Sequence, residues 1–352
     1  MLKADYRIYT LDFKRASGTS RGVLKQKQTY ILRIESEGIQ AYGECNCFRG
    51  LSFDDVPDYE IQLGWTCANI HLGLEELLKK NKYYPSIQFG LEQAFACLDN
   101  KGSSELFDTD FYRKQKGISI NGLIWMGDRK FMLDQIKEKL NQGFSTIKMK
   151  IGAIDFQTEL ELLGYIRSEY SSDDICLRVD ANGAFSPQEA LGKLQALAAY
   201  DLHSIEQPIR QGQLEEMARL CEDSPLDIAL DEELIGVIEH REKKDLLELI
   251  NPAYIILKPA LVGGFKGSQQ WIDLAESQEI DYWITSALEG NIGLNAIAGW
   301  TDTLNSDLDQ GLGTGSLYTN NLQSPLEVKK GHLYYNPASK WDMNQLTKLF
   351  NK

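Results

Sequence analysis

At residues 144–152 the chain reads Phe-Ser-Thr-Ile-Lys-Met-Lys-Ile-Gly, the pattern of a short buried strand that ends in glycine. Side chains alternate between the two faces of a strand, so Lys148 and Lys150 point to the same side. Two ammonium groups on the inner face of a buried strand are costly unless the protein uses them. The alternative is an edge strand with both lysines in solvent, and this stretch alone does not separate the two interpretations.

The composition indicates a globular protein. The chain has 352 residues, which suits one large domain with a smaller partner, and 43% of them are hydrophobic. The net charge of −14 argues against a nucleic acid or an anionic membrane as partner. The N-terminus has no apolar core of a signal peptide, and no apolar stretch approaches about 18 residues, so we expect a cytoplasmic protein. We expect the six scattered cysteines to be reduced thiols.

The N-terminal third predicts a small α+β domain over residues 1–115. Alternating residues indicate strands over 3–15, 28–36 and 39–44, and helical patterns follow from about 55 to 100. A polar, glycine-bearing loop at 16–22 separates the first two strands. Its residues 18–22 and Arg49 in a later loop are candidates for covering a substrate.

From about residue 117 onward, strands and helices alternate strictly. Eight strands fit between about 118 and 313, the first over 118–124 and the last over 308–312, which is the pattern of a (β/α)₈ barrel of the TIM type. The predicted fold class is therefore α/β, with a barrel domain over 116–325 behind the α+β capping domain. The segment 326–352 is expected to return to the capping domain.

Five of the predicted barrel strands end in an ionisable residue. In a parallel barrel these ends meet at one mouth, where active sites lie. Three neighbouring carboxylates repel one another unless a cation lies between them, and oxygen ligands alone select Mg²⁺, with Mn²⁺ as the alternative. Polar loop residues paired with surface lysines are the competing interpretation, which the shared register of the five argues against. The five residues are Lys150, Asp180, Glu206, Asp231 and Lys258.

This set of groups suits one kind of chemistry. A metal can bind a substrate carboxylate and stabilise the enediolate that forms when a proton leaves the α-carbon. A lysine beside the metal and beside a second lysine has a lowered pKa and can act as a base near neutral pH. Lysines from the second and sixth strands would face each other across the mouth. We therefore expect a small-molecule carboxylate as substrate.

These residues resemble the enolase superfamily, in particular its muconate-lactonising subgroup, and the resemblance covers nearly the whole chain. Members use lysine bases together with Mg²⁺ and an enediolate. The related mandelate-racemase subgroup has a histidine near strand 7, whereas the segment 282–287 here has none. The matching motifs are Lys148-Met-Lys150, Val179-Asp-Ala-Asn182, Ile205-Glu-Gln-Pro208, Leu230-Asp-Glu232 and Leu257-Lys-Pro259.

The resemblance implies a role for each motif residue. Lys150 would be the acid and base, Lys148 the neighbour that lowers its pKa, and Lys258 the opposite lysine that stabilises the enediolate by its charge. The metal ligands would be Asp180, Glu206 and Asp231.

Within the subgroup, segments 285–295 and 311–321 look like those of o-succinylbenzoate synthases. That resemblance implies removal of water from 2-succinyl-6-hydroxy-2,4-cyclohexadiene-1-carboxylate in menaquinone biosynthesis. The glycine-rich loop after strand 8, within 311–321, could offer backbone N–H groups to a ligand carboxylate, or could be a tight turn without a ligand. The candidate substrate contacts are Arg49, Asn182, Ser286, Gly313 and Thr314.

Three alternatives stay open. Dipeptide epimerases of the subgroup bind the substrate ammonium group with Asp-x-Asp at the end of strand 8, which Asp307-Leu-Asp309 could mimic. The residues that follow depart from the epimerase pattern, which favours a solvated loop. An N-acylamino-acid racemase would use the same two lysines. A catalytically silent scaffold is the third alternative, and the intact set of five ionisable strand ends argues against it.

Overall fold

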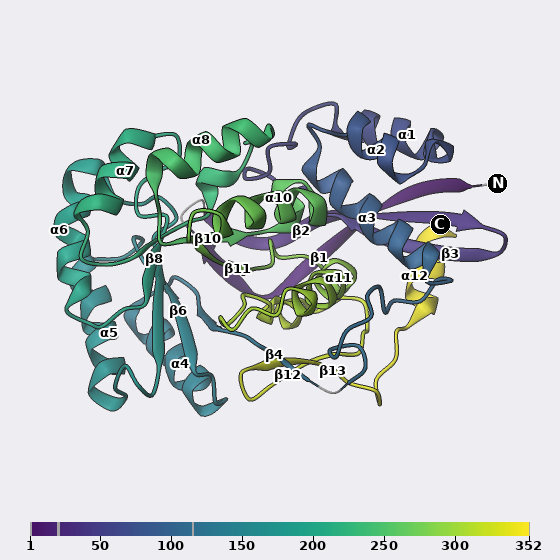
Figure 1. Cartoon of the computed structure of the whole chain (residues 1–352). Helices are drawn as coiled ribbons and strands as arrows, with labels where there is room; N and C mark the ends of the chain where they lie inside the picture. The colour runs from purple at the N-terminus through teal and green to yellow at the C-terminus, as the bar shows by residue number, and fades with distance from the viewer. Residues whose placement is uncertain (1, 20–21, 115, 352) are drawn as a thin grey trace.

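The computed structural model describes residues 2–19, 22–114 and 116–351. It shows an α/β barrel of the TIM type with an N-terminal α+β capping domain beside it (Figure 1). The fold class predicted from the sequence is confirmed. The domain limits 1–115, 116–325 and 326–352 stay a prediction. Among the described residues, no helix is both long and apolar enough to cross a membrane.

The capping domain is a three-stranded antiparallel sheet covered by helices. Gly43 on the third strand lies so close to the third helix that a Cβ there would be 2.0 Å from the carbonyl oxygen of Gly90. Only glycine allows this close approach of strand and helix. The elements are β1 (Lys3–Thr19), β2 (Gly22–Ser36), β3 (Ile39–Cys45), α1 (Tyr59–Ala68), η1 (Ile70–Leu72), α2 (Leu74–Lys80) and α3 (Pro85–Asp99).

The polar loop predicted at 16–22 is wrong in extent. β1 extends to Thr19 and β2 starts at Gly22, and these two residues pair with each other, after a register shift between Asp12 and Ser17. Backbone pairing satisfies the N–H and C=O groups here without any alternation of apolar side chains, which is why the pattern missed it. Residues 20 and 21 lie outside the described residues, so the predicted cover at 18–22 stays a prediction.

The barrel strands are parallel, in the order β11-β10-β9-β8-β7-β6-β5. Two isolated parallel bridges, Thr285 with Gly311 and Ile120 with Gln310, close the ring between β11 and β5. In the part of the chain that the structure describes, a short segment at Gln310 and Gly311 therefore takes the place of the predicted eighth strand. The strands are β5 (Gly122–Ile124), β6 (Thr146–Lys150), β7 (Cys176–Asp180), β8 (Ser204–Glu206), β9 (Ile228–Leu230), β10 (Tyr254–Leu257) and β11 (Asp281–Ile284).

Helices surround this sheet on the outside (Figure 1). Side-chain caps explain where two of them start: Asp128 accepts the N–H of Phe131 at 2.8 Å, and Asp155 accepts that of Thr158 at 3.0 Å. The helices are α4 (Arg129–Asn141), α5 (Phe156–Glu169), α6 (Pro187–Ala198), α7 (Leu214–Asp223), η2 (Glu232–Leu234), α8 (His240–Ile250), α9 (Pro259–Val262), α10 (Gly264–Glu276), α11 (Asn291–Thr303) and η3 (Gly313–Leu317).

The C-terminal segment contacts both parts of the molecule. β12 (Leu326–Lys329) and β13 (His332–Tyr335) form a hairpin that pairs with β4 (Ile118–Ser119). The single strand predicted at 118–124 is therefore split, and only its second half, β5, belongs to the barrel. In α12 (Met343–Phe350), the side chains of Leu346 and Phe350 pack with Ile31 and Tyr42 of the capping sheet.

Glu92 on α3 joins the capping domain to the barrel. Its carboxylate accepts the backbone N–H groups of Phe265 and Lys266, the latter at an N···O distance of 3.1 Å, in the first turn of α10. It thus satisfies N–H groups that the helix itself leaves unpaired. Burial nevertheless raises the pKa of Glu92 to about 7, against the lowering effect of these hydrogen bonds.

The raised pKa of Glu92 predicts a pH-dependent stability near neutrality. Because the folded chain binds this proton more tightly than the unfolded chain, the stabilising contribution is complete below the ordinary glutamate pKa and is lost as the pH rises through about 7. Relative to Glu92→Gln, the wild-type free energy of unfolding should fall by about 2–3 kcal/mol between about pH 5 and about pH 8. Urea unfolding at both pH values measures this fall, and parallel behaviour of the two proteins contradicts it.

Candidate active site

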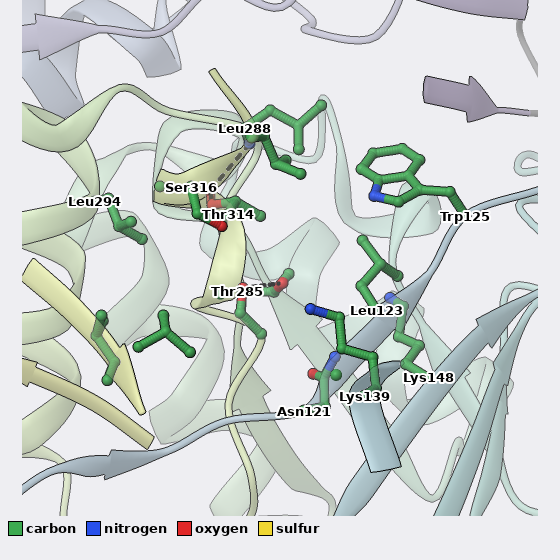
Figure 2. A pocket seen from close by; sticks show the side chains of 18 of the residues that line it. Asn121, Leu123, Trp125, Lys139, Lys148, Thr285, Leu288, Leu294, Thr314 and Ser316 are labelled. Atoms are coloured by element: carbon green, nitrogen blue, oxygen red, sulfur yellow. Dashed lines mark hydrogen bonds between the residues drawn. The ribbon is translucent and has the colours of Figure 1, made fainter. Parts of the chain in front are cut away.

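A cavity of about 820 Å³ lies at the carboxyl ends of the barrel strands. Phe48 and Leu51, from the loop after β3, contribute to its wall together with barrel residues. Figure 2 shows Leu123, Trp125 and Lys148 on one side of the cavity, facing loops that carry Leu288, Thr314 and Ser316. The capping domain and the barrel therefore both contribute to this site.

The three carboxylates predicted as metal ligands lie together at this mouth. Asp180 ends β7, Glu206 ends β8 and pairs in register with it, and Asp231 follows β9. Their exposed fractions are 1%, 2% and 2%. Such buried carboxylates must be paired or must bind a cation.

Three lysines contact these carboxylates. Lys150 Nζ lies 2.8 Å from Asp180 Oδ2 and 2.5 Å from the side-chain oxygen of Asn182. Lys148 Nζ lies 3.1 Å from the same Asp180 oxygen and also donates to Glu206. Lys258, which follows β10, forms an ion pair with Asp231. The structure thus brings together the three lysines predicted to be catalytic and the three carboxylates predicted to bind the metal.

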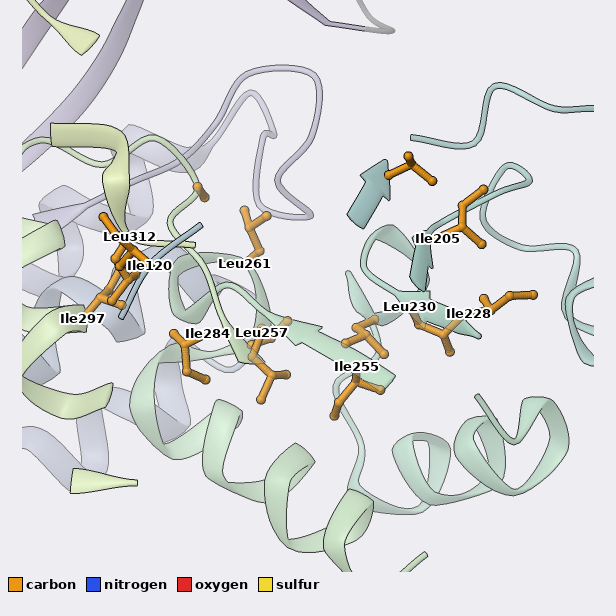
Figure 3. Packing of buried hydrophobic residues seen from close by; sticks show 14 of the residues in the cluster. Ile120, Ile205, Ile228, Leu230, Ile255, Leu257, Leu261, Ile284, Ile297 and Leu312 are labelled. Atoms are coloured by element: carbon orange, nitrogen blue, oxygen red, sulfur yellow. The ribbon is translucent and has the colours of Figure 1, made fainter. Parts of the chain in front are cut away.

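Strand geometry explains why these charged groups face the interior. Each follows an apolar residue of the same strand that points the other way, as Ile205 precedes Glu206, Leu230 precedes Asp231 and Leu257 precedes Lys258. These apolar side chains belong to the packed hydrophobic core outside the mouth (Figure 3). A close-packed core holds the strand ends in place, so the charged groups are preorganised.

The pKa values of these groups reflect their mutual contacts. Burial alone lowers the pKa of Lys148, but Asp180 and Glu206 outweigh it and hold this pKa above the ordinary value. Burial would raise the pKa of Asp180, but Lys148 and Lys150 hold it well below its usual range. The pKa of Glu206 is raised by burial and by the neighbouring charge of Asp180.

The donor set fits a hard divalent cation. As the described side chains stand, no group of three carboxylates, histidines or cysteines is arranged to hold a metal ion, and lysine ammonium groups contact the three acids instead. Nevertheless the three acids offer only carboxylate oxygens, and the buried Glu206 Oε1 accepts no hydrogen bond from the residues that the structure describes. A cation would satisfy that oxygen and relieve the repulsion that raises the pKa of Glu206. The metal site stays a prediction.

Most of the predicted substrate contacts line the cavity, but Arg49 lies elsewhere. Asn182, Ser286, Gly313 and Thr314 are in the cavity wall. The guanidinium of Arg49 instead forms an ion pair with Asp55 and donates to Tyr30 Oη at 2.9 Å. The loop after β3 folds back on itself through this ion pair, so the structure does not bring Arg49 to the site.

Sequence reasoning missed the wall formed by Leu123 and Trp125. Both lie in or just after β5, two residues apart, so strand alternation puts them on one face at the mouth. The predicted strand 118–124 starts four residues before β5 but ends at the same residue, Ile124, so the alternation that identifies this wall was available in the sequence. Phe48 and Leu51 were missed as well, in a loop whose aromatic character was the available hint.

The Asp-x-Asp pair is at the opposite end of the barrel. Asp309 precedes the bridging segment at Gln310, and its Oδ2 accepts a hydrogen bond from Thr146 Oγ1, at the start of β6. Lys150 stands at the other end of the same strand. Asp309 therefore cannot bind a substrate ammonium group at the mouth, and the sequence argument for a dipeptide epimerase loses its support.

Comparisons with known proteins agree with this geometry. The family model described as "Enolase C-terminal domain-like" matches residues 132–338. An o-succinylbenzoate synthase of Desulfotalea psychrophila is 44% identical over 365 residues, which cover 94% of this chain and 98% of that protein. The crystal structure of MenC from D. psychrophila LSv54 superposes with a TM-score of 0.84 at 41% identity, covering 95% of this chain and 99% of that one.

A dipeptide epimerase from Enterococcus faecalis V583, complexed with Mg and the dipeptide L-Leu-L-Tyr, shares the fold. Its TM-score is 0.81 at 20% identity, covering 95% of this chain and 97% of that one. At this identity the likeness extends to the fold alone.

Proposed function

The chain belongs to the enolase C-terminal domain-like family, and from this premise we propose that it is an o-succinylbenzoate synthase, a carbon–oxygen lyase of menaquinone biosynthesis. The observation that carries this assignment is the 44% identity to the D. psychrophila enzyme over nearly the full length. The reaction removes water from 2-succinyl-6-hydroxy-2,4-cyclohexadiene-1-carboxylate to give o-succinylbenzoate. The proposal includes a cytoplasmic location and no nucleic-acid or membrane partner.

Asp180, Glu206 and Asp231 would hold the metal in this proposal. Their burial at consecutive strand ends and the unsatisfied oxygen of Glu206 support this role. We assign Mg²⁺, with Mn²⁺ as the alternative, because the ligands are carboxylates only. The bound ion supplies the positive charge that stabilises an enediolate derived from the substrate carboxylate.

Lys150 carries both proton transfers. As a neutral amine it takes the proton from the carbon next to the carboxylate, and the C–H electron pair goes into the enediolate. When the C–O bond to the hydroxyl group breaks, the ammonium group of Lys150 returns that proton to the leaving hydroxide, which departs as water. Because Lys150 performs both proton transfers from one face of the ring, the proton and the hydroxyl group leave from that same face, which is a syn elimination. Asn182, which accepts from Lys150 Nζ at 2.5 Å, orients the amine.

The other two lysines act through their charge. β10 lies four places from β6 in the strand order, so Lys258 faces the site from the side opposite Lys150 and stabilises the enediolate. Lys148 and Lys150 both contact Asp180 Oδ2. Because Asp180 and Glu206 raise the pKa of Lys148, its ammonium group stays charged and adds positive charge to the site.

A comparison of two reactions tests this function. Purified protein with Mg²⁺ should consume the cyclohexadiene substrate, with loss of diene absorbance and appearance of o-succinylbenzoate by NMR. The same protein incubated with dipeptides or N-acylamino acids in D₂O should exchange the α-proton far more slowly. Exchange without dehydration would show that the chain is an epimerase or a racemase instead.

A further inference from the structure

A buried polar network runs from the capping domain to the loops of the barrel mouth. Lys27 lies on β2, Asn46 directly follows β3, and Glu289 lies in the loop between β11 and α11. Lys27 is 7% exposed, and Asn46 and Glu289 are completely buried. Buried groups of this kind are retained only when they are fully hydrogen-bonded.

Glu289 accepts hydrogen bonds at both carboxylate oxygens. Oε1 accepts from Asn46 Nδ2 at 2.8 Å, and Oε2 accepts from Ser286 Oγ at 2.6 Å. Asn46 Nδ2 also donates to the carbonyl of Ala287 at 3.0 Å, and its side-chain oxygen accepts from the Lys27 ammonium group. The capping domain thereby fixes the loop that follows β11.

The network continues to the wall of the cavity. Thr314 Oγ1, in η3, donates to Ser286 Oγ at 2.8 Å, and both side chains line the cavity. Ser286 Oγ also accepts the backbone N–H groups of Leu288 at 3.0 Å and of Glu289 at 3.3 Å. A carboxylate can only accept, so the Ser286 proton must point to Glu289 and the Thr314 proton to Ser286. Neither hydroxyl group keeps a proton for a ligand.

Lys27 supplies the charge that this arrangement needs. Burial raises the pKa of Glu289, and the Ser286 hydrogen bond and the Lys27 charge oppose that rise. A second buried carboxylate, Glu44, accepts the N–H groups of Gly290 at 2.8 Å and Gly293 at 2.9 Å in the same region. Burial lowers the pKa of Lys27 itself, and the charges of Glu44 and Glu289 oppose that effect. Lys27 is thus placed to balance the charge of Glu289, which accepts hydrogen bonds at both oxygens.

We propose that Lys27, Asn46 and Glu289 are positioning residues of the dehydration reaction, which hold Ser286 and Thr314 in one hydrogen-bonded orientation and thereby place the Gly313–Thr314 loop against the substrate. This inference rests on the proposed function. It also changes the expectation for Ser286 and Thr314: they shape the site, and the donors for a substrate carboxylate are backbone N–H groups of the loop.

The variant Glu289→Gln tests this role. A glutamine presents one acceptor and one donor end, so it cannot accept from both Asn46 and Ser286. We expect KM for the cyclohexadiene substrate to rise about tenfold, and the Kd of o-succinylbenzoate to rise in parallel. We expect kcat to change less than about threefold, because Lys150 and Lys258 are untouched.

A swap of donor and acceptor gives the rescue. In the double variant Asn46→Asp/Glu289→Gln, the new amide donates to the new carboxylate while its oxygen accepts from Ser286, and the net charge is conserved. KM should return to within about threefold of the wild type, short of full recovery because the bond to the Ala287 carbonyl is lost. Glu92→Ala, which removes another buried carboxylate between the two domains, should lower Tm and leave KM unchanged.

The outcomes separate the two proposals. A folded Glu289→Gln protein with unchanged KM, or a double variant no better than the single one, overturns the positioning role. If Glu289→Gln does not fold, Lys27→Met takes its place, and an unchanged KM there is equally decisive. A wild-type protein that does not dehydrate the substrate at all overturns the proposed function instead.

Discussion

Replacing Lys150 by alanine should lower kcat for dehydration by about 10³-fold or more, because in the proposed mechanism the same amine removes the α-proton and returns it to the leaving hydroxide. Substrate binding should change little, since the lysine acts on the reacting atoms. The measurement is the rate of diene absorbance loss, with KM determined in parallel. Lys150 Nζ donates hydrogen bonds to Asp180 at 2.8 Å and to Asn182 at 2.5 Å. An alanine side chain has no donor that could replace them.

Lys243→Met is the matched control for that experiment. Lys243 on α8 is 2% exposed and donates to the carbonyl of Gly267 at 3.2 Å, so it too is a buried lysine, but it does not line the cavity. Its replacement should leave kcat within about twofold. A folded Lys150→Ala protein that keeps a tenth or more of the wild-type rate refutes the role given to Lys150.

Glu206→Gln should abolish the response to Mg²⁺. The change removes one of the three proposed anionic ligands and leaves a neutral amide in its place, so we expect the affinity for Mg²⁺ to fall by about 100-fold or more. An ion that binds only the folded chain raises Tm, so Mg²⁺ should stabilise the wild type and not the variant. Thermal unfolding with and without Mg²⁺ measures this independently of turnover.

Glu92→Gln is the control here, because Glu92 is also a buried glutamate but caps α10 and does not line the cavity. It should keep the full Mg²⁺ response. An equal Mg²⁺-induced rise in Tm for the wild type and for Glu206→Gln would place the metal elsewhere.

The sequence predicted the barrel and its charged mouth because both follow from local pattern. Apolar runs such as those ending at Ile205, Leu230 and Leu257 mark buried strands, and the next residue of each is ionisable. Alternation along the strand then decides that the charges point inward. No contact between distant segments is needed for this inference.

Other features depend on partners far away in the chain. The run at 118–124 looks like one strand, but Ser119 pairs with His332 while Leu123 pairs with Lys148, and these two partnerships split it. From the sequence, Asp309 could lie at the carboxyl end of the eighth strand. In the structure the segment that replaces this strand starts only after Asp309, at Gln310. Arg49 turns away because Asp55 pairs with it. Tertiary pairing overrides local pattern at each of these places.

The network of Lys27, Asn46 and Glu289 shows the same limit on prediction. Lys27 and Asn46 are 19 positions apart in the sequence, and Asn46 and Glu289 are 243 positions apart. Glu289 lies in the segment 285–295 that resembles the o-succinylbenzoate synthases, but nothing in the sequence connects it with Lys27 or Asn46. Their relation becomes visible only once the capping domain is placed on the barrel.

The most direct test of the account is a crystal structure of the protein with Mg²⁺ and o-succinylbenzoate. We expect an ion bound by Asp180, Glu206 and Asp231, and a product ring that lies between Lys150 on one face and Lys258 on the other. An ion bound by other residues, or both lysines on the same face of the ring, would contradict it.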